Sequence, residues 1–335
     1  MGNPWAYDFS AIGRGAPLLV VHGSDADPAA KQQGGFRVGG HSDVYKLLPE
    51  TLAFEQANLG PQFLKKQGRP DLARFKYILN LVTDPDQNPR TLETLQKLLR
   101  GYRGRVINRP EAVLRTGRDQ VAKRLADVAG LRVPKVIRLR NPKPGAASAA
   151  ALRAGMGYPI IARLAGTHTG KIIGLVESPG ELDSACAGAG QFILIEFVDF
   201  RGDDGLYRKC RLWSFGQTTI FRHMLITDKW NVHVSERTRF MINRPGLIEE
   251  EQRLLDRPEG AFPGTVHAVF DAVRERLGLD FFGMDFGIDA QGQVVLFEAN
   301  ATMSFFPLVA HPRFAYLEKI LPPAQQAFRA MLGQS

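Results

Sequence analysis

Two acidic residues and an amide near the C-terminal end of the chain have the types and spacing of a divalent-cation site. Asp285 lies in the apolar segment LDFFGMDFGID, and Glu298 and Asn300 lie close together in QVVLFEAN. Because alternate residues of a strand point to the same side, Glu298 and Asn300 share one face. Carboxylate and amide oxygens are the ligands that Mg²⁺ and Mn²⁺ prefer. The three residues are therefore predicted to bind Mg²⁺ or Mn²⁺.

A hairpin must bring Asp285 beside this strand. The loop DAQG (289–292) is predicted to join two antiparallel strands, and a two- or four-residue loop places Asp285 opposite Leu296. Asp285 and Glu298 are then diagonal neighbours on one face, about 7–8 Å apart. A loop of three or five residues would shift the pairing by one position and put the two carboxylates on opposite faces of the hairpin. An ordinary edge hairpin with exposed acids is the alternative, but the flanking residues are strongly apolar, and uncompensated carboxylates are costly to bury.

The first 110 residues contain alternating strand and helix patterns. The apolar segments PLLVVHG (17–23) and KYILNLVTDPDQNP (76–89) are typical of buried strands, and the second stops at a cluster of Asp, Asn and Pro. TLETLQKLLRGY has helical spacing, with Thr91 as the predicted N-cap. RVINRP (105–110) follows as a third strand. Strand, helix and strand in this order predict a parallel α/β unit, and residues 24–45 are predicted to form a loop.

The middle of the chain is predicted to contain a helix over 117–130 that ends at Gly130, and a strand over 131–139. NPKPGAASAA is predicted to form a turn that leads into a short helix. Residues 158–178 alternate between apolar strands and a polar, glycine-containing loop, which predicts a hairpin.

The remainder of the chain is rich in β-strand patterns. Strands are predicted over 191–198, 207–215 and 218–226, with a tight turn at Gly216 and Gln217, and a helix is predicted over 264–278. The fold class is therefore mixed α/β (α+β).

The order and spacing of these segments resemble the ATP-grasp superfamily, which includes D-alanine–D-alanine ligase and glutathione synthetase. MDFGID and VLFEANATM resemble its metal-binding strands. YPIIARLAGTHTGK resembles its hairpin with a phosphate-covering loop, and ILIEFV resembles the strand that contacts adenine. The similarity runs from about residue 105 to 310. It implies the ATP-grasp fold, with an N-terminal α/β subdomain (1–107), a central subdomain (108–190) and a C-terminal subdomain (191–335).

The resemblance also implies which residues bind ATP. Those expected at the nucleotide are Lys123, Arg163, Gly166, Thr167, His168, Gly170, Glu196, Phe197, Val198, Asp204 and Lys209.

The sequence departs from the family pattern at three points. Arg163 stands where the family usually has a Lys. The acid that usually binds the ribose is missing from its place in the family pattern, and Asp204 is the residue expected to replace it. Gly283 stands where the ligases have an Arg. The Arg that stabilises the oxyanion of the reaction is therefore expected elsewhere, at Arg222 or Arg211.

The activity that the resemblance implies is an ATP-dependent ligation. The γ-phosphoryl group of ATP activates a small carboxylate as an acyl phosphate, and an amine then attacks it to form an amide. A phosphotransferase or another non-ligase, and a nucleotide-binding regulator without catalysis, are the alternatives. The segment FRHMLITDKWNVH (221–233) is dense in anion-binding side chains, and it forms either the substrate side of the site or an exposed polar connection. Small-molecule acids and amines are the expected partners, and a homodimer is left open.

The net charge of +9 is concentrated in one segment. Between Arg100 and Lys143 there are 13 Lys and Arg residues against three Asp and Glu residues. Such a segment indicates a polyphosphate ligand or nucleic acid, or forms a solvated basic face. Its one aromatic residue, Tyr102, offers no platform for stacked bases, so no nucleic-acid partner is expected.

The cysteine content and the hydropathy of the chain indicate the cellular compartment. The two cysteines, Cys186 and Cys210, form no disulfide framework and have no metal-type spacing, which suits a reducing environment. No apolar run approaches the roughly 20 residues of a membrane span. The start MGNPWAYDFS lacks the features of a secretory signal. A cytoplasmic protein without a membrane partner is expected.

Overall fold

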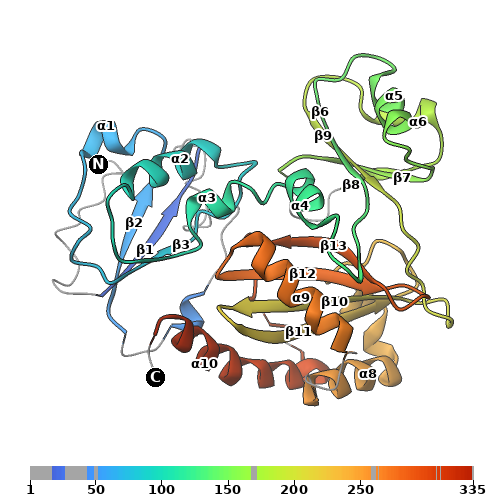
Figure 1. Ribbon diagram of the computed structural model, residues 1–335. Helices are drawn as coiled ribbons and strands as arrows, with labels where there is room; N and C mark the ends of the chain where they lie inside the picture. Colours follow the sequence, from blue (N-terminus) through green and yellow to red (C-terminus); the bar gives the residue numbers. More distant parts are fainter. Residues whose placement is uncertain are drawn as a thin grey trace.

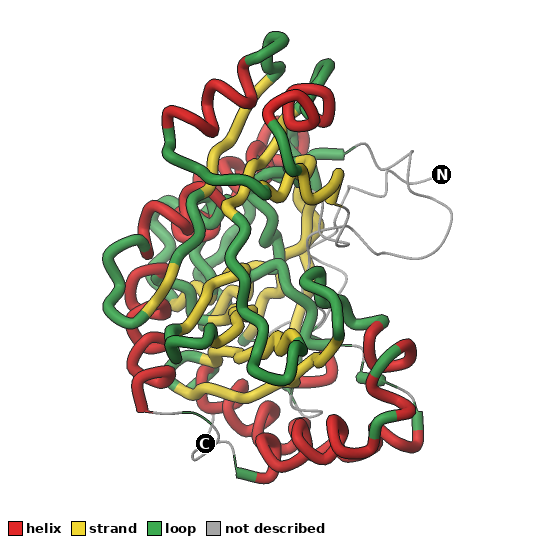
Figure 2. Tube along the Cα trace, turned by 90° about the vertical axis from the view of Figure 1, so that its right-hand side faces the viewer, coloured by secondary structure: helices red, strands yellow, loops and turns green. Residues whose placement is uncertain are grey.

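Three β-sheets organise the chain in this computed structural model (Figure 1). The structure describes residues 17–26, 44–48, 52–166, 172–257, 262, 264–306, 308–309 and 311–333. Most of the loop predicted over 24–45 lies outside these ranges. Seen from the side, strands occupy the middle of the molecule, and helices lie above and below them (Figure 2).

The N-terminal sheet has four parallel strands in the order β2-β1-β3-β4. Its strands are β1 (Leu18–Gly23), β2 (Phe54–Leu59), β3 (Tyr77–Asn80) and β4 (Arg105–Ile107). The predicted parallel α/β unit is therefore confirmed. Strand β2 escaped prediction because its sequence, FEQANL, has neither a continuous apolar run nor a regular apolar–polar alternation. The short helices of this part are α1 (Phe63–Gln67), α3 (Pro110–Val113) and the 3₁₀ turn Tyr45–Leu47.

Helix α2 (Pro89–Leu98) begins two residues earlier than its predicted N-cap, Thr91. Proline is well suited to the first helical position because it has no amide hydrogen to leave unsatisfied there. Asp25, which follows β1, caps the helix from a distance. Its carboxylate accepts hydrogen bonds from the amides of Arg90 (2.9 Å) and Thr91 (2.7 Å) and from the Thr91 hydroxyl (2.7 Å).

The central sheet is antiparallel, in the order β6-β9-β7-β8. Its strands are β6 (Val136–Arg140), β7 (Ile160–Leu164), β8 (Ile172–Val176) and β9 (Gln191–Glu196). The predicted hairpin over 158–178 is confirmed as β7 and β8. Helices α5 (Ala146–Arg153) and α6 (Pro179–Ala185) pack with this sheet around a small apolar core (Figure 1).

The single strand predicted over 131–139 is wrong. Two strands occupy this region, β5 (Leu131–Arg132) in the C-terminal sheet and β6 in the central sheet, and Pro134 lies between them. Proline lacks the amide hydrogen that a continuous ladder needs. Helix α4 (Arg118–Leu125) also ends before Gly130, which has a φ of +78° in the turn before β5.

The C-terminal sheet has the order β11-β10-β12-β13-β5. Its long strands are β10 (Tyr207–Phe215), β11 (Thr218–Thr227), β12 (Phe281–Ile288) and β13 (Val294–Asn300). The predicted tight turn at Gly216 and Gln217 joins β10 to β11. Strand β5 lies in this sheet although its residues fall within the predicted central subdomain (108–190). The predicted domain boundaries stay predictions.

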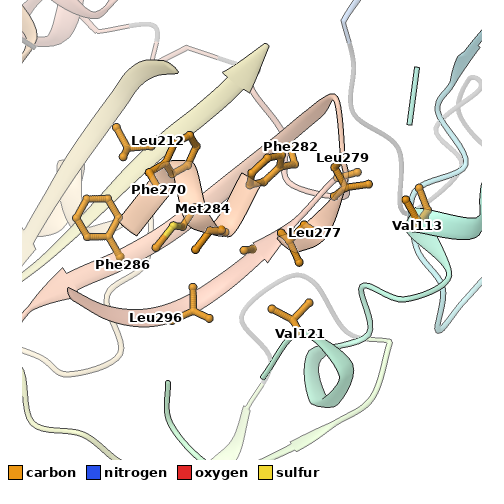
Figure 3. Packing of buried hydrophobic residues seen from close by; sticks show 14 of the residues in the cluster. Val113, Val121, Leu212, Phe270, Leu277, Leu279, Phe282, Met284, Phe286 and Leu296 are labelled. Carbon is orange, nitrogen blue, oxygen red and sulfur yellow. The ribbon is translucent and has the colours of Figure 1, made fainter. Parts of the chain in front are cut away.

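Helices cover the C-terminal sheet. They are α7 (Glu236–Arg239), α8 (Pro245–Asp256), α9 (Gly264–Leu277), α10 (Leu321–Met331) and the 3₁₀ segments Met241–Asn243 and Pro312–Ile320. Phe270 of α9 stacks on Phe282 of β12 within the main apolar core (Figure 3). Among the described residues, no helix has both the length and the apolar character that crossing a bilayer requires.

Candidate functional site

Asp285 and Glu298 pair directly across β12 and β13. The predicted pairing of Asp285 with Leu296 is wrong, because five residues separate the paired Ile288 and Val294. A connection of this length alone would put the two carboxylates on opposite faces. However, β13 contains a β-bulge with one extra residue between Leu296 and Glu298, which reverses the parity a second time. The two carboxylates therefore lie on the same face.

Asp285 is buried between two cations of β10. Arg211 donates from Nε to Oδ1 (2.5 Å) and from Nη2 to Oδ2 (2.8 Å), and Lys209 Nζ lies 3.5 Å from Oδ2. Burial alone would raise the pKa of Asp285, but the charges of Arg211 and Lys209 hold it below its ordinary value. Asp285 is therefore ionised at neutral pH.

Glu298 receives hydrogen bonds from two neighbours. Arg118 Nη2 donates to its Oε1 (2.7 Å), and Asn300 Nδ2 donates to the same oxygen (2.9 Å). The Asn300 Oδ1 accepts the amides of Thr302 (2.8 Å) and Met303 (3.0 Å). Two backbone donors fix which end of the amide is the oxygen. The oxygen of Asn300 holds the turn after β13, and its amide nitrogen faces Glu298, so its predicted role as a metal ligand stays a prediction.

A cavity of about 490 Å³ lies between the central and C-terminal sheets. Its volume is that of a small-molecule site. The predicted residues that line it are Arg163, Glu196, Phe197, Val198, Lys209, Arg211, Arg222, Asp285 and Glu298. Arg163 reaches the cavity from β7. Burial and the nearby charge of Arg118 lower the pKa of Arg163 to about 10, and the charge of Glu298 opposes this shift.

One end of the cavity is aromatic and apolar. Phe200 and Phe297 lie with ring centroids 4.5 Å apart, and Phe197 meets Trp230 edge to face at 5.8 Å. The Glu196 carboxylate accepts the backbone amide of Lys135 (2.9 Å). Flat apolar walls of this kind suit a planar ring, whereas the charged side chains around Asp285 suit charged groups.

Several predicted residues do not line this cavity or cannot be placed relative to it. Lys123 lies on the exposed side of α4 and does not line the cavity. Asp204 is exposed and is held by both terminal nitrogens of Arg208 (3.0 and 2.7 Å), which lower its pKa to about 2. Thr167, His168 and Gly170 lie outside the described residues. Gly166 is described, and it lines a smaller adjoining cavity.

Arg118 was missed from the sequence, although it lines both cavities and contacts Glu298. It is the first residue of α4, where a positive charge opposes the helix dipole. That unfavourable placement is the signal that indicates a role outside the helix. A second arginine that was not singled out, Arg237 of α7, also lines the larger cavity.

The N-terminal sheet closes the smaller cavity. The loop after β3 contributes Asp84 and Asp86, and Gln87 Nε2 donates to the carbonyl of Gly166 at 2.7 Å. The Thr302 hydroxyl donates to the carbonyl of Thr83 at 2.8 Å. All three parts of the chain therefore meet beside Glu298.

The donor set accommodates a hard divalent cation through two carboxylates, with other positions left to water and phosphate oxygens. In the described part of the chain, no group of three or more His, Cys, Asp or Glu side chains is arranged to hold a metal ion. The fit therefore depends on Asp285 and Glu298, one buried and one partly exposed.

A parallel N-terminal sheet followed by two sheets that enclose a cavity defines the ATP-grasp fold, and comparison with solved structures confirms it for this chain. VanG D-Ala:D-Ser ligase from Enterococcus faecalis has 15% identity and a TM-score of 0.51, with 94% of this chain and 98% of that chain covered. A RiPP-associated ATP-grasp ligase from Chryseobacterium gregarium, in complex with ADP and peptides, has 10% identity, a TM-score of 0.55 and coverage of 95% and 97%.

N5-carboxyaminoimidazole synthetase from Staphylococcus aureus, in complex with ADP, has 12% identity, a TM-score of 0.53 and coverage of 96% and 78%. No protein-family model matches the chain, and no curated protein matches it by sequence. At these identities the likeness establishes the fold.

Proposed function

We propose that this protein is an ATP-dependent ligase that joins a small carboxylate to an amine through an acyl phosphate. The observation that carries the proposal is the direct pairing of Asp285 with Glu298 on the wall of a cavity that cations also line. Two of the similar structures are named as ligases, which supports the same reaction class.

The two ends of the cavity suit the two ends of ATP. The base would lie between the aromatic residues Phe197 and Phe297, and the phosphates would extend toward Arg163 and Lys209. Asp285 and Glu298 would hold Mg²⁺ or Mn²⁺, which neutralises phosphate charge and aligns the transferred group when bound.

The surrounding cations position the two carboxylates and offset phosphate charge. Arg211 fixes the orientation of Asp285 with two hydrogen bonds and also approaches the carbonyl of Ser304 (3.3 Å). Burial lowers the pKa of Lys209, and Asp285 opposes this shift. We assign stabilisation of the oxyanion in the amide-forming step to Arg211 of β10, which lies beside Asp285. The other arginine predicted for this step, Arg222 of β11, lies one strand further from Asp285.

An acyl phosphate must be protected from water until the amine arrives. The strands β7 and β8 line the cavity through Arg163 and Ile172, and the hydrogen bond from Gln87 to Gly166 ties the chain just after β7 to the N-terminal part. This hydrogen bond would help to keep water away from the acyl phosphate before the amine binds.

The test is a screen of small acids and amines for release of phosphate from ATP in the presence of Mg²⁺. ADP and phosphate are expected when an acid and an amine are both present, together with an amide product detected by mass spectrometry. A stable phosphorylated product would instead identify a phosphotransferase.

Variants locate the reaction at the proposed site. Asp285→Asn and Glu298→Gln are each expected to weaken metal-dependent turnover at least tenfold, which is roughly the effect of disturbing a metal site. Asp271→Asn is the matched control, because Asp271 lies on the exposed side of α9 and pairs with Arg274. Unchanged turnover in both site variants would remove the metal assignment.

A further inference from the structure

Two arginines and a histidine line the cavity on the side away from β12. They are Arg222 and His223 of β11 and Arg237 of α7, hereafter the β11 cation cluster. Their exposed fractions are 5%, 6% and 1%. Strand β11 is separated from β12 by β10, which places its backbone about 9–10 Å from that of Asp285.

A β-bulge creates this cluster. Arg211 pairs with His223 and Leu212 pairs with Phe221, so Arg222 is the extra residue of β11. In a regular strand, neighbouring side chains point to opposite faces. The bulge allows Arg222 and His223 to line the same cavity, and bulges often redirect side chains next to functional sites in this way.

His223 lacks a partner for one of its ring nitrogens. The Nε2 atom is buried and has no hydrogen-bond partner within the described part of the chain. Burial and the charges of Arg211 and Arg222 hold the pKa of His223 well below its ordinary value, so the imidazole is neutral at pH 7. Buried polar atoms are rarely left unsatisfied, and a group bound in the cavity would supply the missing partner of Nε2.

Arg237 is held rigidly in place. Glu251 accepts hydrogen bonds from both terminal nitrogens of Arg237, and it also accepts the hydroxyl of Tyr316 (2.6 Å) and the amide of Met224 (2.9 Å). A guanidinium fixed in this way presents a preorganised charge to the cavity.

The lining of the cavity has an excess of positive charge. Burial and the charges of Arg237 and Arg211 lower the pKa of Arg222 to about 9. Among the described residues that line the cavity, Lys and Arg outnumber Asp and Glu by six to three. These are Arg118, Arg163, Lys209, Arg211, Arg222 and Arg237 against Glu196, Asp285 and Glu298. Two of these acids are paired with Arg118 and Arg211, and Arg237 is paired with Glu251, which does not line the cavity.

We propose that the β11 cation cluster binds a second anionic group of the acid substrate, so that the acid that is activated is a dicarboxylate or a comparable dianion. This inference rests on the proposed ligase function. One anionic group would lie near Asp285 for phosphorylation, and the other would be bound by Arg222 and Arg237, with His223 as a further hydrogen-bond partner. Guanidinium groups match carboxylate and phosphate oxygens in pairs.

Binding without nucleotide tests the cluster separately from the reaction. Calorimetric titration of the full chain would compare succinate, glutarate, adipate and pimelate with their monoamides, which have the same length and one charge fewer. O-phosphoserine and serine form a second pair for a phosphate group. Loss of a charged hydrogen bond predicts about 10- to 100-fold weaker binding of the less charged member of the preferred pair. Equal affinities within every pair, or no binding by any member, would overturn the proposal.

Variants place the effect at the cluster. Arg222→Met is expected to abolish the preference for the dianion, and Arg222→Lys, which keeps the charge without the paired geometry, is expected to retain part of it. Arg201→Met is the matched control, because Arg201 is exposed, pairs with Asp199 and does not line the cavity. Thermal unfolding would verify that each variant is folded. If Arg222→Met keeps the full preference, the cluster does not bind the second group.

The two proposals fail in different ways. Selective binding of dianions without ATP turnover for any acid and amine would retain the anion site and reject the ligase. Turnover that is equally fast with monocarboxylates and dicarboxylates would retain the ligase and reject the second anionic group.

Discussion

Asp285 faces Glu298 because β13 contains one residue more than β12 between this pair and the next. Two irregularities, a five-residue connection and a bulge, offset one another. Their combined effect places both carboxylates on the wall of the cavity between the central and C-terminal sheets. The position of the bulge is therefore as important to the proposed metal site as the identity of the two acids.

Removal of the extra residue of the bulge is expected to leave the two acids paired. Deletion of Phe297 puts Glu298 directly after Leu296, which pairs with Phe286, so Glu298 still falls opposite Asp285 in a regular ladder. ATP binding measured with Mg²⁺ should therefore match that of Phe297→Ala, which keeps the bulge and is the control for loss of the ring. Far-ultraviolet circular dichroism would verify that both chains are folded. Loss of metal-dependent binding by the deletion variant alone would contradict the proposed role of the pairing.

Asp285 is expected to make stability depend on pH. Its pKa in the folded state lies below the ordinary value of 3.8. The stabilisation from its ionised form is therefore complete above that value and is lost as the pH falls through the folded-state pKa. Asp285→Asn should lower the free energy of unfolding by about 3 kcal/mol at pH 7, because Arg211 loses its charged partner.

Denaturant unfolding from pH 7 to pH 3 would measure this difference. The gap between the natural chain and Asp285→Asn should narrow below about pH 4, as protonation makes the carboxyl neutral like the amide. The exposed Asp271→Asn should differ little from the natural chain throughout. A gap of constant size across the range would show that the ionised form of Asp285 is not stabilising.

Adjacent glutamates of α8 should respond very differently to the same substitution. Glu251 is fully buried against Arg237, so Glu251→Gln leaves a buried charge without its partner and should cost about 3–5 kcal/mol. Glu250 pairs with the partly exposed Arg208, and Glu250→Gln should cost about 0–1 kcal/mol. Chemical denaturation measures both. Similar losses would indicate that the pair beneath the cavity does not stabilise the fold.

The hydrogen bond between Gln87 and Gly166 is expected to limit wasteful hydrolysis. Gln87→Ala removes the donor, so water should reach the acyl phosphate more readily. The ratio of phosphate released to amide formed should rise by roughly the few-fold change that one neutral hydrogen bond confers. Gln191→Ala is a useful comparison, since Gln191 is exposed at the start of β9. An unchanged ratio would show that this hydrogen bond does not control the access of water to the acyl phosphate.

Several features were accessible from the sequence because they depend on local patterns. The parallel N-terminal unit follows from apolar runs that alternate with helical spacing, and the β7–β8 hairpin follows from two such runs around a polar loop. The clustering of Asp285 and Glu298 was also anticipated, although from an incorrect register. The motif order predicted the ATP-grasp fold, which the solved structures confirm.

Long-range contacts decided what the local patterns could not. Pro134 was visible, but its separation of β5 from β6 into different sheets depends on which neighbours each strand finds. Arg118 contacts Glu298 across 180 positions of sequence, so no local pattern connects them. The two backbone amides that donate to the oxygen of Asn300 belong to the turn after β13, and the sequence pattern did not indicate them.

The sequence by itself therefore determined which chemical groups are present, namely carboxylates and basic side chains within apolar strands. Which of them share a cavity was decided by tertiary structure, through one extra residue in β13 and another, Arg222, in β11. The physical reason is the two-residue period of a strand, because a single inserted residue exchanges the two faces without leaving a recognisable pattern in the sequence.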